Sequence, residues 1–143
     1  MEETSVLKKI IFFKGLSSWE LIQVNKLIEL HLFKSGDQIV KEGTKCDAFY
    51  IIKNGMVKVE KKRREIATLG SEEPIGEVSF IDSGVRSATI TALQDTVLIK
   101  IPSDKFKELM SNSTEIAHKV YKTIAITLCE RLRETNDILI QIH

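Results

Sequence analysis

The sequence has little cysteine and histidine, and this shortage excludes several kinds of protein. Its two cysteines, Cys46 and Cys129, lie far apart and form no Cys-x-x-Cys pair, so they cannot supply the ligands of a usual iron–sulfur cluster. The three histidines are isolated from one another, whereas a metal-dependent barrel enzyme needs a His-x-His pair with further ligands. No Gly-x-Ser-x-Gly elbow or Cys–His pair indicates a catalytic nucleophile. We therefore expect no enzyme activity, no metal and no cofactor.

The chain also lacks a long apolar segment and an excess of one charge. No apolar run approaches the roughly 20 residues that span a bilayer, and Met1 is followed by two glutamates instead of the basic start of a secretion signal. The formal net charge of +1 gives little attraction for nucleic acid. We expect residues 1–143 to form a single cytoplasmic domain that binds neither membrane nor DNA directly, with both cysteines reduced.

The sequence divides into three parts, and the first two differ in the spacing of their apolar residues. Residues 1–31 form the N-terminal helical segment: Ser17 and Glu20 fit a capping box, and apolar residues then recur at helical spacing, which predicts a helix over 17–30. Residues 32–101 carry six glycines between short β-branched or aromatic runs, which predicts a β-barrel or jelly roll. The expected strands cover residues 38–41, 48–53, 56–60, 65–69, 87–92 and 96–101.

The third part, residues 102–143, is predicted to be helical, so the fold class is mainly β with flanking helices: a jelly-roll β-barrel plus a long C-terminal helix. Ser103 is expected to cap a short helix up to Met110, and a final helix is expected from Thr114 to Ile142. A heptad seam typical of helix pairing in a dimer runs through Ala117, Tyr121, Ile124, Leu128, Arg131, Thr135, Ile138 and Ile142. Apolar residues off this seam, available to pack on the barrel, are Val120, Ile126, Leu132 and Leu139. The alternative is an ordinary amphipathic helix that packs only on its own barrel.

One segment combines residue types that suit a phosphate group. Gly76 and Glu77 stand at the start of a brief helical turn, and Arg86 and Ser87 enter a strand ten residues later. A phosphate diester needs a permanently charged donor and backbone N–H groups directed at its oxygens, which an arginine fork and a helix N-terminus supply. A carboxylate beside the phosphate would repel it unless it accepts a hydrogen bond from a sugar hydroxyl. The alternative is that Arg86 is a surface arginine paired with a glutamate just before Gly76.

This segment and two earlier ones resemble the cyclic nucleotide-binding domain family, whose members include the catabolite activator protein and the regulatory domains of cyclic-nucleotide-dependent kinases and channels. The three stretches are Gly36–Gly43, Asp47–Val59 and Pro74–Thr89. They occur in the family's order, and the resemblance extends over about residues 10–140. It implies the family's jelly-roll fold and its ligand, a cyclic nucleotide.

Carried over by position, the resemblance implies a set of ligand-binding residues. Those in the segment are Gly76, Glu77, Val78, Ser79, Arg86, Ser87 and Ala88. Gly76 lets the backbone approach the ligand, Glu77 binds the ribose 2′-hydroxyl, and the backbone of the next two residues faces the sugar-phosphate. Arg86 pairs with the cyclic phosphate and Ser87 adds a hydroxyl and an N–H beside it. Ala88 stays small so that the backbone can come close.

The nucleotide base is implied to rest against the last helix. The stretch Arg131–Asp137 resembles the part of the catabolite activator protein that carries two adjacent hydroxyl residues touching adenine, one from each subunit of a dimer. Thr135 matches the first position, and Asn136 replaces the second hydroxyl with an amide that can also donate and accept. The resemblance therefore favours cyclic AMP over cyclic GMP as the ligand, and a homodimer through the C-terminal helix.

We expect a regulatory sensor in signal transduction, whose C-terminal helix shifts when the nucleotide binds and acts on an unidentified downstream protein. One alternative is the ligand-sensing half of a transcription regulator, because a helix-turn-helix domain would begin where this chain ends at His143. The sequence is then either a fragment or a sensor without its own output. A scaffold module that binds no nucleotide is the second alternative.

The cationic run Lys61–Arg64 is predicted to form a solvated hairpin tip, with a partner or nucleic-acid patch as the alternative.

Overall fold

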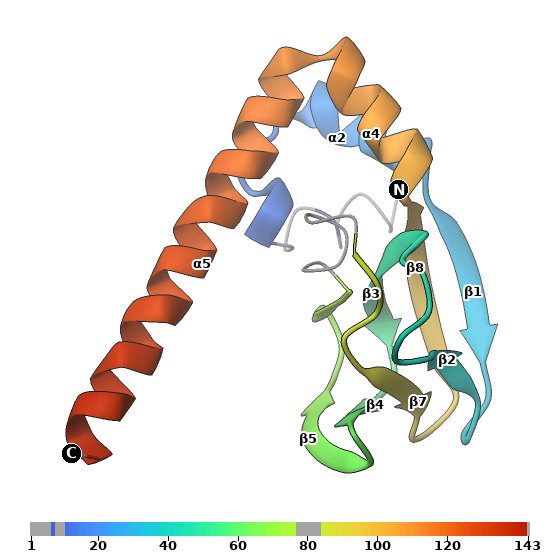
Figure 1. Ribbon diagram of the computed structural model, residues 1–143. Coiled ribbons are helices and arrows are strands. Elements are labelled where there is room, and N and C mark those ends of the chain that lie inside the picture. Colours follow the sequence, from blue (N-terminus) through green and yellow to red (C-terminus); the bar gives the residue numbers. More distant parts are fainter. Residues whose placement is uncertain (1–6, 8–10, 77–83, 143) are drawn as a thin grey trace.

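Two antiparallel sheets form the body of the molecule. The computed structural model describes residues 7, 11–76 and 84–142, and Figure 1 shows the two sheets facing one another. The first sheet has the order β1 (Glu29–Phe33), β8 (Thr96–Pro102), β3 (Ala48–Asn54) and β6 (Pro74–Ile75). The second has the order β2 (Gln38–Val40), β7 (Thr89–Ala92), β4 (Val57–Lys61) and β5 (Arg64–Leu69). The prediction of a mainly β fold with flanking helices is confirmed.

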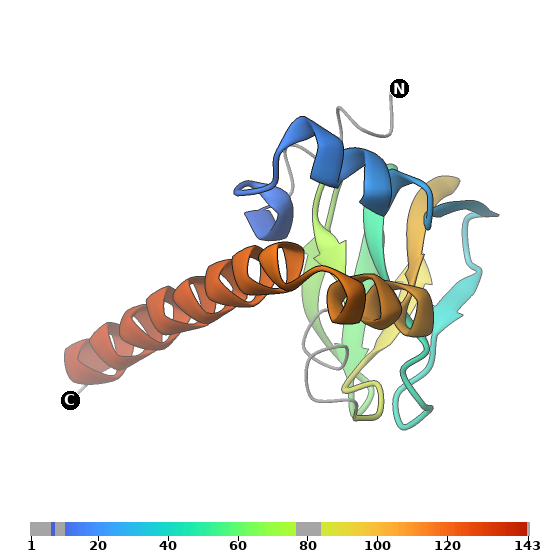
Figure 2. The same cartoon turned by 90° about the horizontal axis from the view of Figure 1, so that it is seen from above.

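The helices gather over one side of the first sheet (Figures 1 and 2). They are η1 (Ile11–Phe13), α2 (Ser18–Asn25), α4 (Ser103–Asn112) and α5 (Thr114–Ile142). A cluster of buried phenylalanines connects helix α4 with η1 and with the first sheet. The ring of Phe106 in α4 lies 5.9 Å from that of Phe13 in η1 and 6.0 Å from that of Phe49 in β3. Over the described residues, no helix combines the length and the apolar character needed to cross a membrane.

Strand β3 explains why the first sheet lies at the centre of the fold. Its first five residues are all buried, because successive side chains of a strand point to opposite faces and both faces are covered. Phe49 and Ile51 pack into the core under the helices, while Ala48 and Tyr50 pack into the core between the two sheets. The sheet therefore separates a helical layer from the interior of the β-roll.

The long helix α5 changes its surroundings half-way along. Its first half is anchored in the helical core by Ile116, Val120 and Ile124, which are at most 5% exposed. Every described side chain after Thr127 is exposed, and the helix projects away from the sheets (Figures 1 and 2). The heptad seam is thus divided, since Ile124 is buried in its own domain. The prediction that the off-seam residues pack on the barrel holds for Val120 and is wrong for three of them. Ile126, Leu132 and Leu139 are 49%, 61% and 48% exposed.

Two local predictions also need correction. The helix expected over 17–30 ends at Asn25, and β1 begins at Glu29 because this segment pairs antiparallel with β8; cross-strand pairing outweighs a helical spacing of apolar residues. Ser103 does not cap α4: the N-cap is Pro102, with no side-chain cap hydrogen bond, and Ser103 is a buried first residue of the helix.

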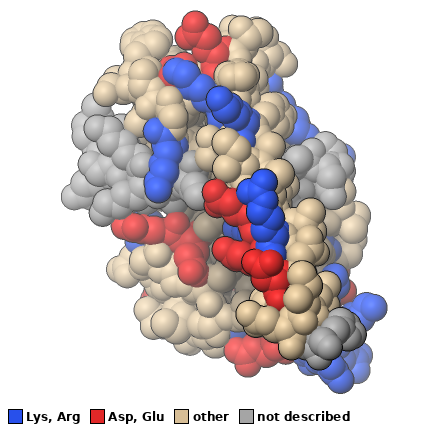
Figure 3. Space-filling view, turned by 90° about the vertical axis from the view of Figure 1, so that its left-hand side faces the viewer, with Lys and Arg blue, Asp and Glu red and all other residues tan. Residues whose placement is uncertain are grey.

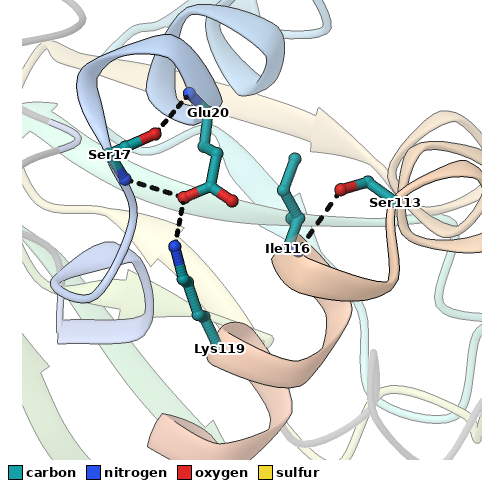
Figure 4. A network of polar contacts seen from close by, with 5 residues as sticks. All are labelled: Ser17, Glu20, Ser113, Ile116 and Lys119. Carbon is teal, nitrogen blue, oxygen red and sulfur yellow. Dashed lines mark hydrogen bonds and ion pairs between the residues drawn. The ribbon is translucent and has the colours of Figure 1, made fainter.

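The predicted capping box forms and also connects two distant helices (Figure 4). The Ser17 amide donates to Glu20 Oε1 at 2.8 Å, and the Glu20 amide donates to Ser17 Oγ at 3.2 Å. Lys119 Nζ from α5 donates to the same Glu20 oxygen at 2.7 Å. First Lys119 and then the Ser17 amide lower the pKa of the Glu20 carboxyl below its ordinary value of 4.5, because both stabilise the ionised form. This contact holds α2 against the anchored half of α5.

We expect Glu20→Gln to lower the free energy of unfolding at pH 7 by about 1 kcal/mol, a modest value because Lys119 is partly open to water. A carboxyl with a lowered folded-state pKa stabilises the fold above its unfolded pKa, and this contribution is lost as the pH falls through the folded pKa. The difference between wild type and variant should therefore shrink as the pH falls below the ordinary pKa of 4.5, and it should disappear once the pH is below the lowered pKa of Glu20. Urea unfolding at a series of pH values measures this difference in the free energy of unfolding. A difference that stays constant down to low pH would contradict the assignment.

Candidate functional site

A hollow lies against the second sheet, beside the loop that carries Arg86. It has a volume of about 530 Å³, which is within the usual range for small-molecule sites. Its apolar wall comes from β2, β4, β5 and β7, and its polar groups include Glu73, Arg86, Ser87 and Arg131. The described lining residues are Val40, Val59, Ile66, Ala67, Leu69, Glu73, Pro74, Ile75, Gly76, Arg86, Ser87, Ala88, Ile90 and Arg131. A mainly apolar lining with a few charged groups suits a ligand that is itself part apolar and part anionic.

Arg86 is the most buried charge in this hollow, with only 3% of its surface exposed. Its backbone is fixed on both sides, because the amide donates to Thr44 O at 2.7 Å and the carbonyl accepts from the Gly43 amide at 2.9 Å. The side chain contacts strand β3: Nη2 donates to Ala48 O at 2.5 Å, and the guanidinium lies 5.7 Å from the centre of the Tyr50 ring. The interpretation of Arg86 as a surface arginine is therefore wrong.

The charge of Arg86 is incompletely balanced. Its neighbouring carboxylate is Asp47, at 3.6 Å from Nη2, and Asp47 itself is exposed to water. Nη1 is buried and has no hydrogen-bond partner among the described residues. A guanidinium cannot lose its proton in a protein, and an unmatched buried donor costs about 1–3 kcal/mol. The site is therefore arranged to accept an anion next to Nη1.

Gly76 lies directly beside this free donor. Its φ of +81° belongs to the left-handed region, which glycine adopts without steric cost. A Cβ atom at this position would overlap Arg86 Nη1. The absence of a side chain at Gly76 therefore leaves room for the guanidinium and for whatever it binds.

Of the predicted ligand residues, the structure brings four together at the hollow. Gly76, Arg86, Ser87 and Ala88 all line it, with Ser87 exposed and Ala88 half-buried against the core between the sheets. The predictions for Glu77, Val78 and Ser79 fall outside the described residues.

The two predicted base-contacting residues lie elsewhere. Thr135 and Asn136 are on the projecting part of α5, fully exposed, and they do not appear in the described lining of the hollow. The Thr135 hydroxyl donates to the carbonyl of Arg131 one turn earlier, at 2.9 Å. In this single chain, therefore, neither residue is brought to the site of Arg86.

Arg131 is the residue that the sequence reasoning missed. It reaches the hollow from α5, although Arg86 is 45 positions earlier in the chain. A signal was present, because Arg131 is the one charged residue of a mainly apolar heptad seam, and a charge in a seam needs a polar neighbour. Its destination depends on the angle at which α5 leaves the β-roll, and this angle is not encoded in any local pattern.

Some other chemistries find no support within the described residues. No group of three or more His, Cys, Asp or Glu side chains there is arranged to hold a metal ion. Cys46 is half-buried and Cys129 is exposed on α5, and both are free thiols. Burial, and then the nearby Asp47 charge, raise the pKa of the Tyr50 phenol, which keeps it neutral beside Arg86. The neutral Tyr50 ring therefore adds no negative charge beside Arg86.

A β-roll with a buried arginine beside an apolar hollow defines a class of ligand-binding regulatory domain, and comparison with known proteins gives the family. The pattern of the family described as "Cyclic nucleotide-binding domain" matches residues 30–113. The chain therefore belongs to the cyclic nucleotide-binding domain family.

Similar sequences occur as parts of longer proteins. The chain is 31% identical over 125 residues to the cGMP-dependent protein kinase of Eimeria tenella, which covers 87% of this chain and 12% of the kinase. It is 30% identical over 129 residues to the Cyclic AMP receptor protein of Thermus thermophilus, covering 87% of this chain and 58% of that protein. The chain thus spans about an eighth of the kinase and somewhat over half of the receptor protein.

Solved structures show the same architecture. The N-terminal domain of a transcriptional regulator from Streptomyces coelicolor A3(2) superposes with a TM-score of 0.79 at 28% identity, covering 92% of this chain and 95% of that one. The Catabolite Activator Protein of Thermus thermophilus superposes with a TM-score of 0.78 at 28% identity, covering 92% of this chain and 62% of that one. The predicted family and jelly-roll fold are confirmed.

Proposed function

We propose that this protein is a sensor that binds a cyclic nucleotide in the hollow beside Arg86. The observation that supports this most strongly is the buried Arg86 guanidinium, whose Nη1 has no partner among the described residues and lies against Gly76. A cyclic phosphate offers one negative charge and two free oxygens, which a guanidinium binds in fork geometry. Ser87 adds a hydroxyl to the same end of the hollow. The apolar wall formed by β2, β4, β5 and β7 is suited to the sugar and the base.

We further propose cyclic AMP as the preferred ligand, with cyclic GMP as the alternative. The family resemblance assigns the ribose 2′-hydroxyl to Glu77 and the sugar-phosphate to the backbone of Val78 and Ser79. The Cyclic AMP receptor protein of Thermus thermophilus is one of the similar proteins, whereas the kinase of Eimeria tenella is named for cyclic GMP. Thr135 and Asn136 offer a hydroxyl and an amide that can serve an adenine amino group.

The response is proposed to be a change in the placement of α5. The helix carries Arg131 into the hollow, and Arg131 belongs to the half of α5 whose described side chains are all exposed. A bound nucleotide that contacts Arg131 favours the helix placement in which that contact forms, and it can shift the equilibrium only by this difference in affinity. The anchored half, held by Ile116 and Val120, would act as the fixed end.

A homodimer through α5 fits the same arrangement. Tyr121, Leu128 and Ile138 of the predicted seam are 44%, 42% and 56% exposed, and a second helix would cover them. Pairing would also bring Thr135 and Asn136 of one subunit toward the hollow of the other, which their position on a single chain does not allow. The downstream partner of such a dimer is a separate protein or a further domain.

A sensing half of a transcription regulator is the second candidate for the protein's role. The observation in its favour is the structural match to the N-terminal domain of such a regulator, of which this chain covers 95%. A reading frame that continues after His143 into a helix-turn-helix would support this role. A frame that stops there would support the free-standing sensor.

Titration with cyclic AMP, cyclic GMP and 5′-AMP tests the proposal, with calorimetry for affinity and the melting temperature as a second readout. A ligand that binds only the folded state stabilises it by about 2.7 kcal/mol at 100 times its dissociation constant. We expect the melting temperature to rise with cyclic AMP, to rise less with cyclic GMP and to stay unchanged with 5′-AMP. No change at millimolar cyclic nucleotide would favour the scaffold module. The emission of Trp19 is a poor reporter, because this residue lies on α2 and does not line the hollow.

A further inference from the structure

The hairpin between β4 and β5 has a turn that its own residues disfavour. The two strands are joined by Lys62 and Arg63, whose φ angles are 51° and 65°. Two-residue hairpins with positive φ at both positions strongly prefer Asn-Gly, because side chains crowd the backbone in the left-handed region. The turn is nevertheless well fixed: the Lys62 amide donates to Glu42 Oε1 at 3.0 Å. The local geometry therefore gives no reason for these two long cationic side chains.

The charges at the tip of this hairpin, residues 61–64, destabilise the turn further. Lys61 and Arg64 are directly opposite one another in the β4–β5 ladder, and like charges in that position destabilise a hairpin. All four residues from 61 to 64 are exposed, and none of them has an ion-pair partner in the part of the chain that the structure describes. The neighbouring acids Glu60 and Glu65 belong to the opposite face of the hairpin, because side chains alternate along a strand.

The tip also stands out against the charge of the whole molecule. The chain has 21 cationic and 20 acidic residues. Without these four cations it would have 17 against 20, a net charge of −3. The face that carries α5 has both cationic and acidic side chains (Figure 3). Four of the 21 cationic residues thus follow one another at this tip, and the rest of the chain has a small net negative charge.

We propose that the Lys61–Arg64 tip is a docking site for a short acidic segment of a partner protein. A sequence that breaks a local structural rule without a structural gain points to a role outside the fold. Four unpaired cations at one point attract carboxylates and speed encounter with them. The site does not include the residues that line the hollow, so it does not depend on the ligand proposed above.

The shape and charge of the tip favour a short protein segment over two other anionic partners. A nucleic acid needs many phosphate contacts along an extended cationic surface, whereas the cationic run covers four residues and the rest of the chain has more acidic than cationic residues. Binding to an anionic membrane through a small site is usually supported by apolar residues that insert into the interface, and residues 61–64 offer none. A segment with a few adjacent carboxylates matches the area and the charge of the tip.

The test uses the whole chain, labelled with nitrogen-15, and a synthetic peptide of six glutamates at low salt. We expect amide shifts confined to the β4–β5 hairpin, and peptide affinity that is about ten-fold weaker in the double variant Lys62→Asn/Arg63→Gly. Because Asn-Gly suits the turn, the same variant should melt about 3 °C higher. A gain in stability together with a loss of binding separates a docking role from a structural one. The variant Lys61→Gln/Arg64→Gln, which keeps the turn residues, should also lose affinity.

The matched control is Lys122→Gln/Arg133→Gln, which removes two exposed cations from α5 and should bind the peptide as wild type does. Equal peptide binding by wild type and both tip variants would overturn the proposal, and so would a lower melting temperature in the Asn-Gly variant. A short DNA duplex, or vesicles of phosphatidylserine and phosphatidylcholine in equal parts, serves as a competing probe. Tighter binding of either one at the tip than of the peptide would overturn the assignment of the partner.

Discussion

Arg86→Lys is expected to weaken cyclic nucleotide binding by about 30-fold, because charge-assisted hydrogen bonds each contribute roughly 1.5–3 kcal/mol. Arg86 serves two neighbours at once: Nη2 donates to Ala48 O, and Nη1 is left for an anion. A lysine ammonium is a point charge without the planar fork and cannot reproduce both contacts in the same geometry. Isothermal calorimetry with cyclic AMP measures the change in affinity.

Lysine is a better test here than a charge reversal. A glutamate at a position with 3% exposure would face the carbonyl of Ala48 and bury an unpaired negative charge, which destabilises a fold strongly. Loss of binding could then reflect unfolding. Arg133→Lys on the exposed part of α5 is the matched control and should leave the affinity unchanged. A folded Arg86→Lys variant with wild-type affinity would show that Arg86 does not bind the ligand.

Phe106→Ala is expected to lower the free energy of unfolding by about 3–5 kcal/mol, the usual range for removing a fully buried phenylalanine. Phe106 has no exposed surface and joins α4 to Phe13 and Phe49 through ring contacts at 5.9 and 6.0 Å. The loss therefore weakens the attachment of the helical layer to the first sheet. Urea unfolding followed by circular dichroism measures it.

Leu32→Ala is the control for this prediction. Leu32 is also a large apolar residue, but 73% of its surface is exposed in β1, so its removal should cost less than about 0.5 kcal/mol. If both variants lost similar stability, the aromatic cluster would not be the main attachment of the helices. A Phe106→Ala loss below about 1 kcal/mol would lead to the same conclusion.

Sequence patterns predicted those parts of the fold that depend on neighbours in the chain. The capping box of Ser17 and Glu20 needs only three residues, and it formed as expected. The hairpin around Lys61–Arg64 was also predicted, since strands on both sides and a charged run marked its turn. By contrast, the helix expected over 17–30 overlaps the start of β1 at Glu29 and Leu30. Only the pairing of this segment with β8, some 67 positions later, makes it a strand.

The residues of the candidate site also include some that sequence patterns predicted and some that they could not predict. Arg86 and Gly76 were predicted as ligand residues because their offset is a family pattern. The structure places both at the hollow, with Nη1 of Arg86 lacking a hydrogen-bond partner among the described residues and lying where a Cβ of residue 76 would be. Arg131 could not be found from the sequence, since its place in the hollow depends on the direction of α5. Thr135 and Asn136 lie outside the described lining of the hollow. In the dimer proposed above, a second chain would bring them to a base, and no pattern within one chain gives the position of its partner.

Strand β3 is shared by the two halves of the molecule. Ala48 and Tyr50 on one face contact Arg86, while Phe49, between them in sequence, belongs to the aromatic cluster under α4 on the other face. Ligand affinity and resistance to unfolding consequently cannot be adjusted independently at this strand. Natural or selected variants with altered nucleotide affinity should therefore accumulate changes in pairs, one on each side of the first sheet, rather than singly.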